Sequence, residues 1–233
     1  MEYTSNYAAE SAFQTQTTNR SESSWTIPQL LLALGLFYIA LAAISYFFIL
    51  TDSVYVRGLA EKMTAERIEE FIEMRSEYWW GTLIAPPVVM LMRVVYTALC
   101  IAVGIIILGQ NLSYSRIVKI ALFAESIFLL EVVVKVLCGL FILNVRVPDD
   151  YANFAPLSAL QFFDVSSLKL WMKHPLRTVN LFELAYMLVL AYFLTPLLKK
   201  RTYLQTLGLV VSSYGLGLLL WVVALAFLLL QVS

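Results

Sequence analysis

The sequence predicts an all-α fold, an integral membrane five-helix bundle with interfacial amphipathic helices. Two observations indicate this class. Hydrophobic residues make up 61% of the 233-residue chain, whereas soluble domains have about 45 to 50% apolar residues. Five apolar stretches are also long enough to cross ~30 Å of hydrocarbon as helices. These stretches are residues 27–50, 88–109, 117–144, 181–198 and 203–232.

The five stretches and their connectors occupy nearly the whole chain, so we expect one membrane domain over residues 27–233. Residues 1–26 are rich in Ser, Thr, Gln and Asn and lack apolar periodicity, which predicts a flexible polar tail. The first apolar stretch begins late and is longer than a signal peptide core, so it is expected to remain as an anchor.

The connector over residues 51–81 has the periodicity of an amphipathic helix. Its apolar residues recur at spacings of three, four and seven: Leu59, Met63, Ile68, Phe71, Ile72, Tyr78 and Trp79. Thr64 is the expected N-cap. Glu69, Glu73 and Glu77 form a row on another face, which we interpret as a solvated face and, alternatively, as a cation or partner site. Pro86 and Pro87 are expected in the first turn of the second span.

The connector over residues 145–179 is interrupted by Pro148, Pro156 and Pro175. Between the prolines, residues 157–171 predict one or two short, half-buried helices that lie on the membrane surface or cap the bundle. The chain's only histidine, His174, has no second His or Cys nearby, so no metal site is predicted. Cys100 and Cys138 lie inside predicted spans, where they are expected to pack as small hydrophobic residues.

The basic residues of short loops predict the orientation in the membrane. Lys199, Lys200 and Arg201 fill the connector between the fourth and fifth spans, which places this connector in the cytoplasm. The N-terminus is then cytoplasmic and the C-terminus outside. The two long connectors assigned to the outside carry more basic residues in total, which is a signal of the opposite sign.

Ionisable residues inside the spans form the candidate site, because a charge at the centre of a membrane helix costs at least ~2.5 to 3.5 kcal/mol. This candidate intramembrane charge cluster comprises Arg93, Glu125, Glu131, Lys135 and Glu183. Glu131 and Lys135 are spaced for an ion pair on one helical face.

The second and third spans form a hairpin, which predicts which of these charges lie at equal depth. Arg93 and Glu131 are equally far from the turn near Leu112, so Arg93, Glu131 and Lys135 are predicted to lie together. Glu125 is expected to face another neighbour, and Glu183 to approach Lys135. The cluster is interpreted as a structural lock between helices, with a proton or ion relay as the alternative.

Small residues in the fifth span predict a close helix contact. Gly208 with Ser212 and Ser213 with Gly217 are spaced four apart, as in small-xxx-small packing motifs. The contact is either within the chain or with another protein, including a second copy.

The sequence has no signature of an enzyme or a cofactor site. HExxH, GxSxG and phosphate-loop patterns are absent, and no histidine is available to activate a serine. The 16 basic and 16 acidic residues balance, which argues against a nucleic-acid surface. We therefore predict a non-enzymatic protein with no cofactor and no nucleic-acid partner.

The order of parts resembles the Yip1 domain family, which has a polar N-terminal tail, five spans and a short C-terminus. Local stretches also resemble that family: residues 109–122 (GQNLSYSRIVKIAL), residues 163–171 from Phe163-Asp-Val to Trp171, residues 180–186 (NLFELAY) and the basic turn at Lys199. The acidic helix before Pro86 is similar to that of bacterial members. A single Gly109 replaces the expected glycine pair, and Glu125 and Glu131 add more charge than the family pattern implies.

The resemblance implies a membrane scaffold or adaptor whose eukaryotic members bind small GTPases in traffic between the endoplasmic reticulum and Golgi. The bacterial-type helix favours the bacterial cytoplasmic membrane, with the endoplasmic reticulum or Golgi as the eukaryotic alternative. Expected partners are the lipid bilayer and other membrane proteins, with self-association possible. A small ion- or proton-coupled transporter is the rival hypothesis, and a subunit of a larger membrane machine is a third.

Overall fold

The computed structural model describes residues 25–165 and 167–232, and within them every regular element is a helix. The all-α class is therefore confirmed for the described chain. The predicted polar tail, residues 1–26, lies outside the described residues except for its last two positions. An isolated antiparallel bridge joins Ser158 to Asn180.

The elements follow one another as α-helices and short π- or 3₁₀-helical segments, the latter labelled η. They are α2 (Ile27–Ile44), η1 (Ser45–Ile49), α3 (Asp52–Leu59), α4 (Ala65–Glu77), α5 (Trp79–Ile107), α6 (Tyr114–Ala124), α7 (Ser126–Phe141), α8 (Pro148–Asn153), η2 (Ala159–Phe162), α9 (Leu170–Thr178), α10 (Leu181–Leu194), η3 (Thr195–Leu197), α11 (Tyr203–Val210), η4 (Val211–Gly215) and α12 (Leu216–Val232).

Three helical segments are long and apolar enough to cross a membrane: Ile27–Ile49, Trp79–Ile107 and Tyr203–Gln231. Leu181–Leu197 is a shorter apolar helix. The stretch expected to form the third span is divided into α6 and α7 at Glu125. Three of the five predicted spans thus reach the length of a span as single helices.

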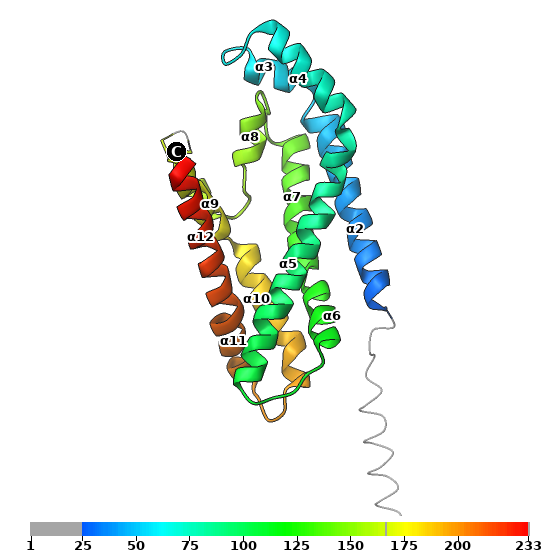
Figure 1. The fold of residues 1–233 in the computed structure, drawn as a ribbon, viewed down its shortest axis with the longest axis vertical. Helices are drawn as coiled ribbons and strands as arrows, with labels where there is room; N and C mark the ends of the chain where they lie inside the picture. Colours follow the sequence, from blue (N-terminus) through cyan, green and yellow to red (C-terminus); the bar gives the residue numbers. More distant parts are fainter. Residues whose placement is uncertain (1–24, 166, 233) are drawn as a thin grey trace, which may run out of the picture.

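The long helices run side by side as an elongated bundle (Figure 1). α5 packs against α2, α6 and α11, and α10 packs against α6, α7 and α11. At one end, which we call the upper end after its place in Figure 1, lie α3, α4 and α8. The α5–α6 and α10–α11 turns lie at the opposite, lower end. α2 starts at the lower end and α12 finishes toward the upper end, so the first and last helices begin and end at opposite poles of the bundle.

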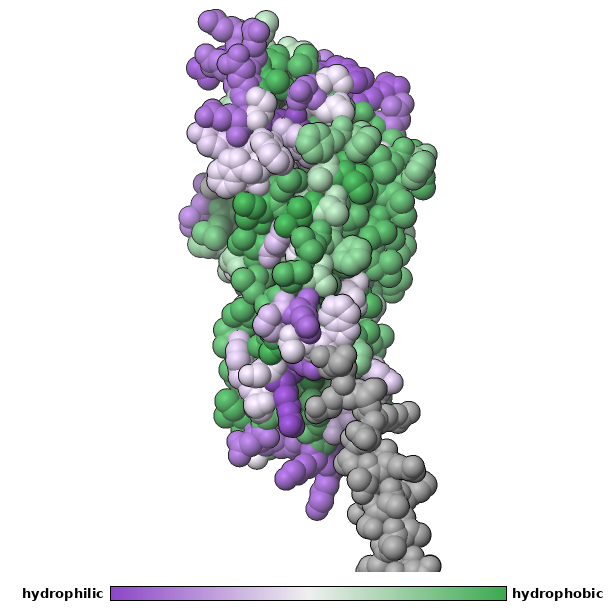
Figure 2. Space-filling view, turned by 90° about the vertical axis from the view of Figure 1, so that its right-hand side faces the viewer, coloured by the Kyte–Doolittle hydropathy of each residue, from purple (hydrophilic) through white to green (hydrophobic). Residues whose placement is uncertain are grey.

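The core is made of apolar side chains from the inner faces of these helices. Its largest cluster joins buried residues of α5, α6, α10 and α11, among them Ile101, Ile105, Leu190, Leu194 and Val210. The outer faces are apolar too: Figure 2 shows hydrophobic side chains over most of one face, between hydrophilic ends. An apolar surface of this extent is unfavourable in water and favourable in hydrocarbon. The described chain therefore has the character of an integral membrane protein.

The first connector folds into α3 and α4, and Thr64 is the N-cap residue of α4 as predicted. The prediction for Pro86 and Pro87 was wrong. α5 begins at Trp79, and both prolines lie inside it. Each proline removes one amide from the helical hydrogen-bond ladder. The carbonyls that lose a donor are those of Thr82 and Leu83, near the upper end of α5, where the Thr82 residue is exposed.

The second connector forms α8, η2 and α9, so its helices only partly overlap the predicted residues 157–171. The side chain of Asp150 accepts hydrogen bonds from the amides of Arg146 and Val147 at 2.9 and 3.0 Å, which fixes the start of α8. Residues 163–165 and 167–169, which lie between η2 and α9, form turns and bends and not regular helix.

The two small-residue pairs of the fifth span differ in what they contact. A Cβ on Gly217 would lie 2.6 Å from the Cys100 sulfur, and the Tyr96 hydroxyl donates to the Gly217 carbonyl at 2.7 Å. Ser213 approaches Gly104 of α5 in the same way. In contrast, a Cβ on Gly208 would meet nothing within 4 Å. The Ser213 and Gly217 pair therefore packs within the chain.

Candidate functional site

A charge pair joins three helices in the middle of the bundle, with the carboxylate fully buried and the arginine side chain 30% exposed. The Arg93 guanidinium of α5 donates two hydrogen bonds to the Glu125 carboxylate, one of them from Nε to Oε2 at 3.2 Å. It donates a third to the Tyr38 hydroxyl of α2 at 3.1 Å. Tyr38 in turn donates to Glu125 Oε1 at 3.0 Å. The Arg93 Cζ atom also lies 3.9 Å from the centre of the Phe128 ring, a favourable cation–π contact.

Glu125 reaches this position because it occupies a one-residue turn between α6 and α7. The helical hydrogen bonds continue through the turn: the Glu125 amide donates to Ala121 at 2.9 Å, and Leu129 donates to Glu125 at 3.0 Å. The Ser126 hydroxyl donates to the Phe123 carbonyl at 2.8 Å, a type of bond that often bends helices. The carboxylate is thereby held inside the bundle with none of its surface exposed.

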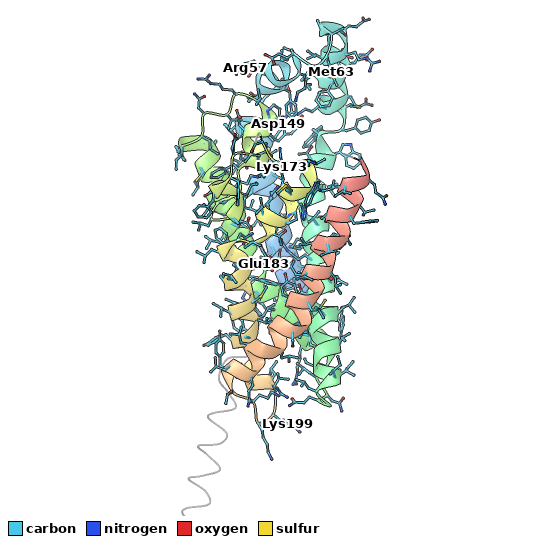
Figure 3. The ribbon with its side chains drawn as sticks, turned by 90° about the vertical axis from the view of Figure 1, so that its left-hand side faces the viewer. Arg57, Met63, Asp149, Lys173, Glu183 and Lys199 are labelled. Carbon is cyan, nitrogen blue, oxygen red and sulfur yellow. The ribbon has the colours of Figure 1, made fainter. Side chains whose placement is uncertain are left out.

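A second buried carboxyl lies on α10. Glu183 accepts a hydrogen bond from the Tyr214 hydroxyl of η4 at 2.7 Å. Its backbone amide donates to the Asn180 side chain at 2.6 Å, so Asn180 caps the start of α10. Among the described residues, no cation lies within ion-pair distance of Glu183. Figure 3 shows Glu183 within the length of the bundle, away from both ends.

Aromatic rings connect the two carboxyl groups. Tyr186 packs against Phe128, with ring centroids 4.7 Å apart, and against Tyr214, at 5.4 Å. Its hydroxyl donates to the Thr97 hydroxyl at 3.1 Å. We call the whole assembly the central polar network; its members are Tyr38, Arg93, Thr97, Glu125, Glu183, Tyr186 and Tyr214.

The centre of this network is dry. Thr97, Glu125 and Tyr186 have no exposed surface, and the one charge of Arg93 is matched by that of Glu125. A neighbouring void is too small to hold a water molecule; it is lined by Thr97, Ile101, Ile117, Ile120, Ala121, Leu190 and Leu194. The arrangement can hold five elements in fixed register, namely α2, α5, the α6–α7 turn, α10 and η4, because each polar group needs a partner from another element.

Arg93, Glu131 and Lys135 were predicted to lie in one charge cluster, but the direct ion pair of Arg93 is with Glu125; Arg93 and Lys135 act on Glu131 only at longer range. The turn between α5 and α6 is centred closer to the N-terminus than Leu112. The two helix ends that flank this turn are Ile107 of α5 and Tyr114 of α6. Counted from these ends, Arg93 and Phe128 are equally far along their helices, whereas Glu131 is farther. Arg93 stacks on Phe128 at that depth and reaches Glu125 about one helical turn away.

The remaining cluster residues have other neighbours. Lys135 Nζ lies 4.8 Å from the centre of the Tyr151 ring of α8. Among the described residues, no ion pair within 4.0 Å joins Lys135 to Glu131 or Glu183. Arg177 of α9 acts electrostatically on both Glu131 and Lys135. The five predicted residues thus divide into the Arg93–Glu125 pair, the Glu131 and Lys135 region near α9, and Glu183.

The predicted set missed the uncharged members of the central polar network: Tyr38, Thr97, Tyr186 and Tyr214. A tyrosine in an apolar span needs a partner for its hydroxyl, so its presence is a usable signal. No spacing rule connects Tyr38 to Glu125, because the two lie on different helices far apart in the chain. Only the packing of α2 against α6 and α7 brings them together.

A second partnered arginine, which the sequence analysis did not predict, joins α4 to η1 and α3. The Arg75 side chain is only 10% exposed and forms an ion pair with Asp52. Its Cζ lies 4.1 Å from the Tyr46 ring centre and 4.5 Å from that of Tyr55. It also donates to the Leu50 carbonyl at the end of η1. The sequence feature that could have predicted this site is the position of Arg75 on the apolar face of the amphipathic pattern that forms α4.

His174 of α9 has a buried Nδ1 atom without a hydrogen-bond partner among the described residues. Burial, and then the positive charge of Arg177, lower the pKa of His174 below its usual value. No group of three or more His, Cys, Asp or Glu side chains in residues 25–165 and 167–232 is placed to hold a metal ion.

The fold and the central polar network define the class: a helical integral membrane protein with one ion pair, Arg93–Glu125, between its apolar helices. Comparison with models of protein families, with curated proteins and with solved structures finds no match. The resemblance to the Yip1 domain family therefore stays a prediction.

Proposed function

We propose that this chain is a non-enzymatic membrane scaffold or adaptor of the Yip1-like type. The observation that supports the proposal is the neutralised Arg93–Glu125 pair, whose carboxylate is fully buried and also accepts a hydrogen bond from Tyr38. A transport site needs polar groups that water and ions can reach. A pair that is satisfied inside the protein fits a lock that fixes the relative positions of helices.

In this proposal the chain crosses the membrane five times. The spans are α2, α5, α6 with α7, α10 with η3, and α11 with α12. α6 and α7 serve as one span because their hydrogen-bond ladder continues through Glu125. α3, α4, α8 and α9 lie at the interface, where amphipathic helices place apolar faces toward lipid and polar faces toward water.

The proposed location is the bacterial cytoplasmic membrane, with the lower end in the cytoplasm. Lys199 lies at this lower end (Figure 3), which also carries Lys200 and Arg201 and the start of α2. Basic short loops favour the cytoplasmic side. In a eukaryotic cell, the same resemblance implies the endoplasmic reticulum or Golgi. The partners would be other membrane proteins or further copies of this chain.

Crosslinking in cells tests the scaffold directly. Photoreactive residues would be placed at Glu73 and Lys200, one at each polar end, and at Leu36 on the exposed apolar face of α2 as the control. We expect discrete, reproducible protein adducts at a polar end and lipid adducts at Leu36. Adducts with protein at neither polar end would contradict a scaffold.

The alternative is a small proton- or ion-coupled transporter. Glu183 favours it, since this carboxyl is buried without a cation and bonds to Tyr214, which packs on Tyr186. In liposomes that contain the purified full chain, a transporter should show proton or cation flux that Glu183→Gln abolishes while helicity is retained. The scaffold requires that flux equal that of empty liposomes in the wild type and in the variant.

A further inference from the structure

The connector between α8 and α10 has one side anchored in the protein and one side turned outward. Ala155 and Leu160 are almost completely buried. Leu157, Phe162 and Phe163 are 56%, 88% and 51% exposed. Adjacent exposed phenylalanines outside the long helices are unfavourable in water and mark a contact surface.

This outward side is held in place by the backbone. The Ala159 amide donates to the Val179 carbonyl at 2.8 Å, and the Leu181 amide donates to Leu157 at 3.1 Å, so the two ends of the loop are joined. Leu157 has a φ of 55°, a left-handed conformation that is uncommon for residues other than glycine. The loop therefore presents Leu157 and the two phenylalanines from a closed, fixed base.

A row of basic residues lies beside them. Lys169, Lys173 and Arg177 are spaced four apart, which places them on one face of α9. Lys169 and Arg177 are exposed, and among the described residues none of the three has an ion-pair partner within 4.0 Å. Arg177 is partly balanced by Glu131 at longer range.

The basic row and the phenylalanines share one region of the molecule. η2, which contains Phe162, packs against α9. Figure 3 shows Lys173 between Asp149, toward the upper end, and Glu183, inside the bundle. α9 also packs against α12, the last apolar helix. This is the level at which a bilayer around the long helices would change from hydrocarbon to headgroups.

We propose that this η2–α9 surface, made of Leu157, Phe162, Phe163, Lys169, Lys173 and Arg177, binds the headgroups of anionic phospholipids. The inference rests on the placement of the long helices in a membrane. The apolar side chains enter the acyl boundary, and the lysines extend their apolar stems along it and place their ammonium groups at the phosphates. Charge complementarity selects anionic over zwitterionic lipid, since each basic residue near such a surface strengthens binding.

Native mass spectrometry of the purified full chain tests the proposal. The protein in neutral detergent would be titrated with phosphatidylglycerol or phosphatidylcholine, and the two dissociation constants compared. We expect the wild type to prefer phosphatidylglycerol. Lys169→Gln with Lys173→Gln should reduce the preference by about fivefold for each lysine removed. Phe162→Ser with Phe163→Ser should weaken the binding of both lipids and leave the preference for phosphatidylglycerol unchanged.

The control variant removes two positive charges, as the lysine variant does, from the same end of the protein. Arg57→Gln with Arg67→Gln changes two exposed arginines of α3 and α4, outside the η2–α9 surface, and should leave the preference within about twofold. Thermal unfolding in neutral detergent checks that all variants fold.

Three results would overturn the inference. The first is equal loss of preference in the control and in the lysine variant. The second is equal competition by free glycerol phosphate, which would make the ligand a soluble anion. The third is equal affinity of the wild type for phosphatidylglycerol and phosphatidylcholine. That result would favour an acidic protein as the partner of this surface. None of these outcomes changes the crosslinking result expected of a scaffold.

Discussion

Glu125 has no exposed surface, and its carboxylate depends on two side chains from other helices, Arg93 and Tyr38. Such a group is stable in its charged form only while its partners remain. Removal of one member of a buried pair leaves an uncompensated charge, whereas removal of both leaves apolar side chains that hydrocarbon and core tolerate.

We therefore expect Arg93→Met and Glu125→Met each to lower the free energy of unfolding by about 3 to 5 kcal/mol. The double variant should lose less than the sum of the two. The measurement is reversible denaturant unfolding of the full chain in bicelles, followed by circular dichroism. Glu69→Gln on the exposed face of α4 is the control and should change stability by about 0.5 kcal/mol or less. Additive losses would contradict a coupled lock.

His174 gives a pH dependence at the same scale. Burial lowers its pKa in the folded protein, so the unfolded chain binds a proton more readily. The contribution of His174 to stability is then fully present above the ordinary histidine pKa of about 6.5 and decreases as the pH falls below it. α12 and η2, which pack against α9, carry no titratable group in their described residues; Glu131 and Lys135 of α7 act on Arg177, and Arg177 adds repulsion to a protonated His174.

Trp171 lies in α9 and can report this change. Its fluorescence in the full chain should shift toward that of a solvated indole as the pH is lowered from 7.5 to about 5. In His174→Gln the transition should be absent, because the titrating group is gone. The other four tryptophans would first be replaced by phenylalanine. An identical transition in the glutamine variant would assign the pH dependence to another group.

At the scale of elements, α12 packs closely against α5 because Gly217 has no side chain at the point of contact. A Cβ on Gly217 would lie 2.6 Å from the Cys100 sulfur and 3.1 Å from the Tyr96 hydroxyl. Contacts of this kind force neighbours apart, and overpacking costs about 1 to 3 kcal/mol. Gly208, on the same span, has open space around it.

Gly217→Ala should therefore lower the free energy of unfolding by about 1 to 3 kcal/mol. Gly208→Ala is the matched control, with the same change in composition and helix propensity. It should leave stability unchanged or raise it by up to about 1 kcal/mol, because alanine favours the helix. Thermal unfolding in one detergent compares them. If Gly208→Ala destabilised more than Gly217→Ala, Gly208 would lie in a contact between copies of the chain.

At the scale of the whole molecule, the positions of the termini follow from the number of crossings. α2 starts toward the lower end of the bundle and α12 finishes toward its upper end (Figure 1), which is the arrangement that the proposed five crossings require. The same arrangement places Met63 at the upper end and Lys199 at the lower end (Figure 3).

Cysteine labelling in intact cells tests the proposed orientation. Met63→Cys should react with an impermeant maleimide from outside, and Lys199→Cys only after the membrane is permeabilised. The background would carry Cys100→Ala and Cys138→Ala, because both native thiols lie within helices. The opposite pattern would invert the orientation, and reaction of both from one side would contradict an arrangement with the two ends on different sides.

The sequence by itself determined the helical class, most helix positions and the presence of charges that need partners. Apolar length and the 3.6-residue period are local properties, so they can be read along one chain segment. Thr64 as a helix cap is of this kind. Pro86 and Pro87 are the local exception, because α5 begins at Trp79, about two turns before them.

Only the tertiary structure decided which charges meet. Arg93 pairs with Glu125 and Tyr38 because the helix ends, the one-residue turn at Glu125 and the packing of α2 set both the depth and the direction of each side chain. Depth along a hairpin can be counted from sequence, but rotation about the helix axis is fixed by the packing of neighbouring helices. Glu131 was therefore an equally plausible partner from the sequence, but in the folded protein it feels the charge of Arg93 without forming an ion pair with it.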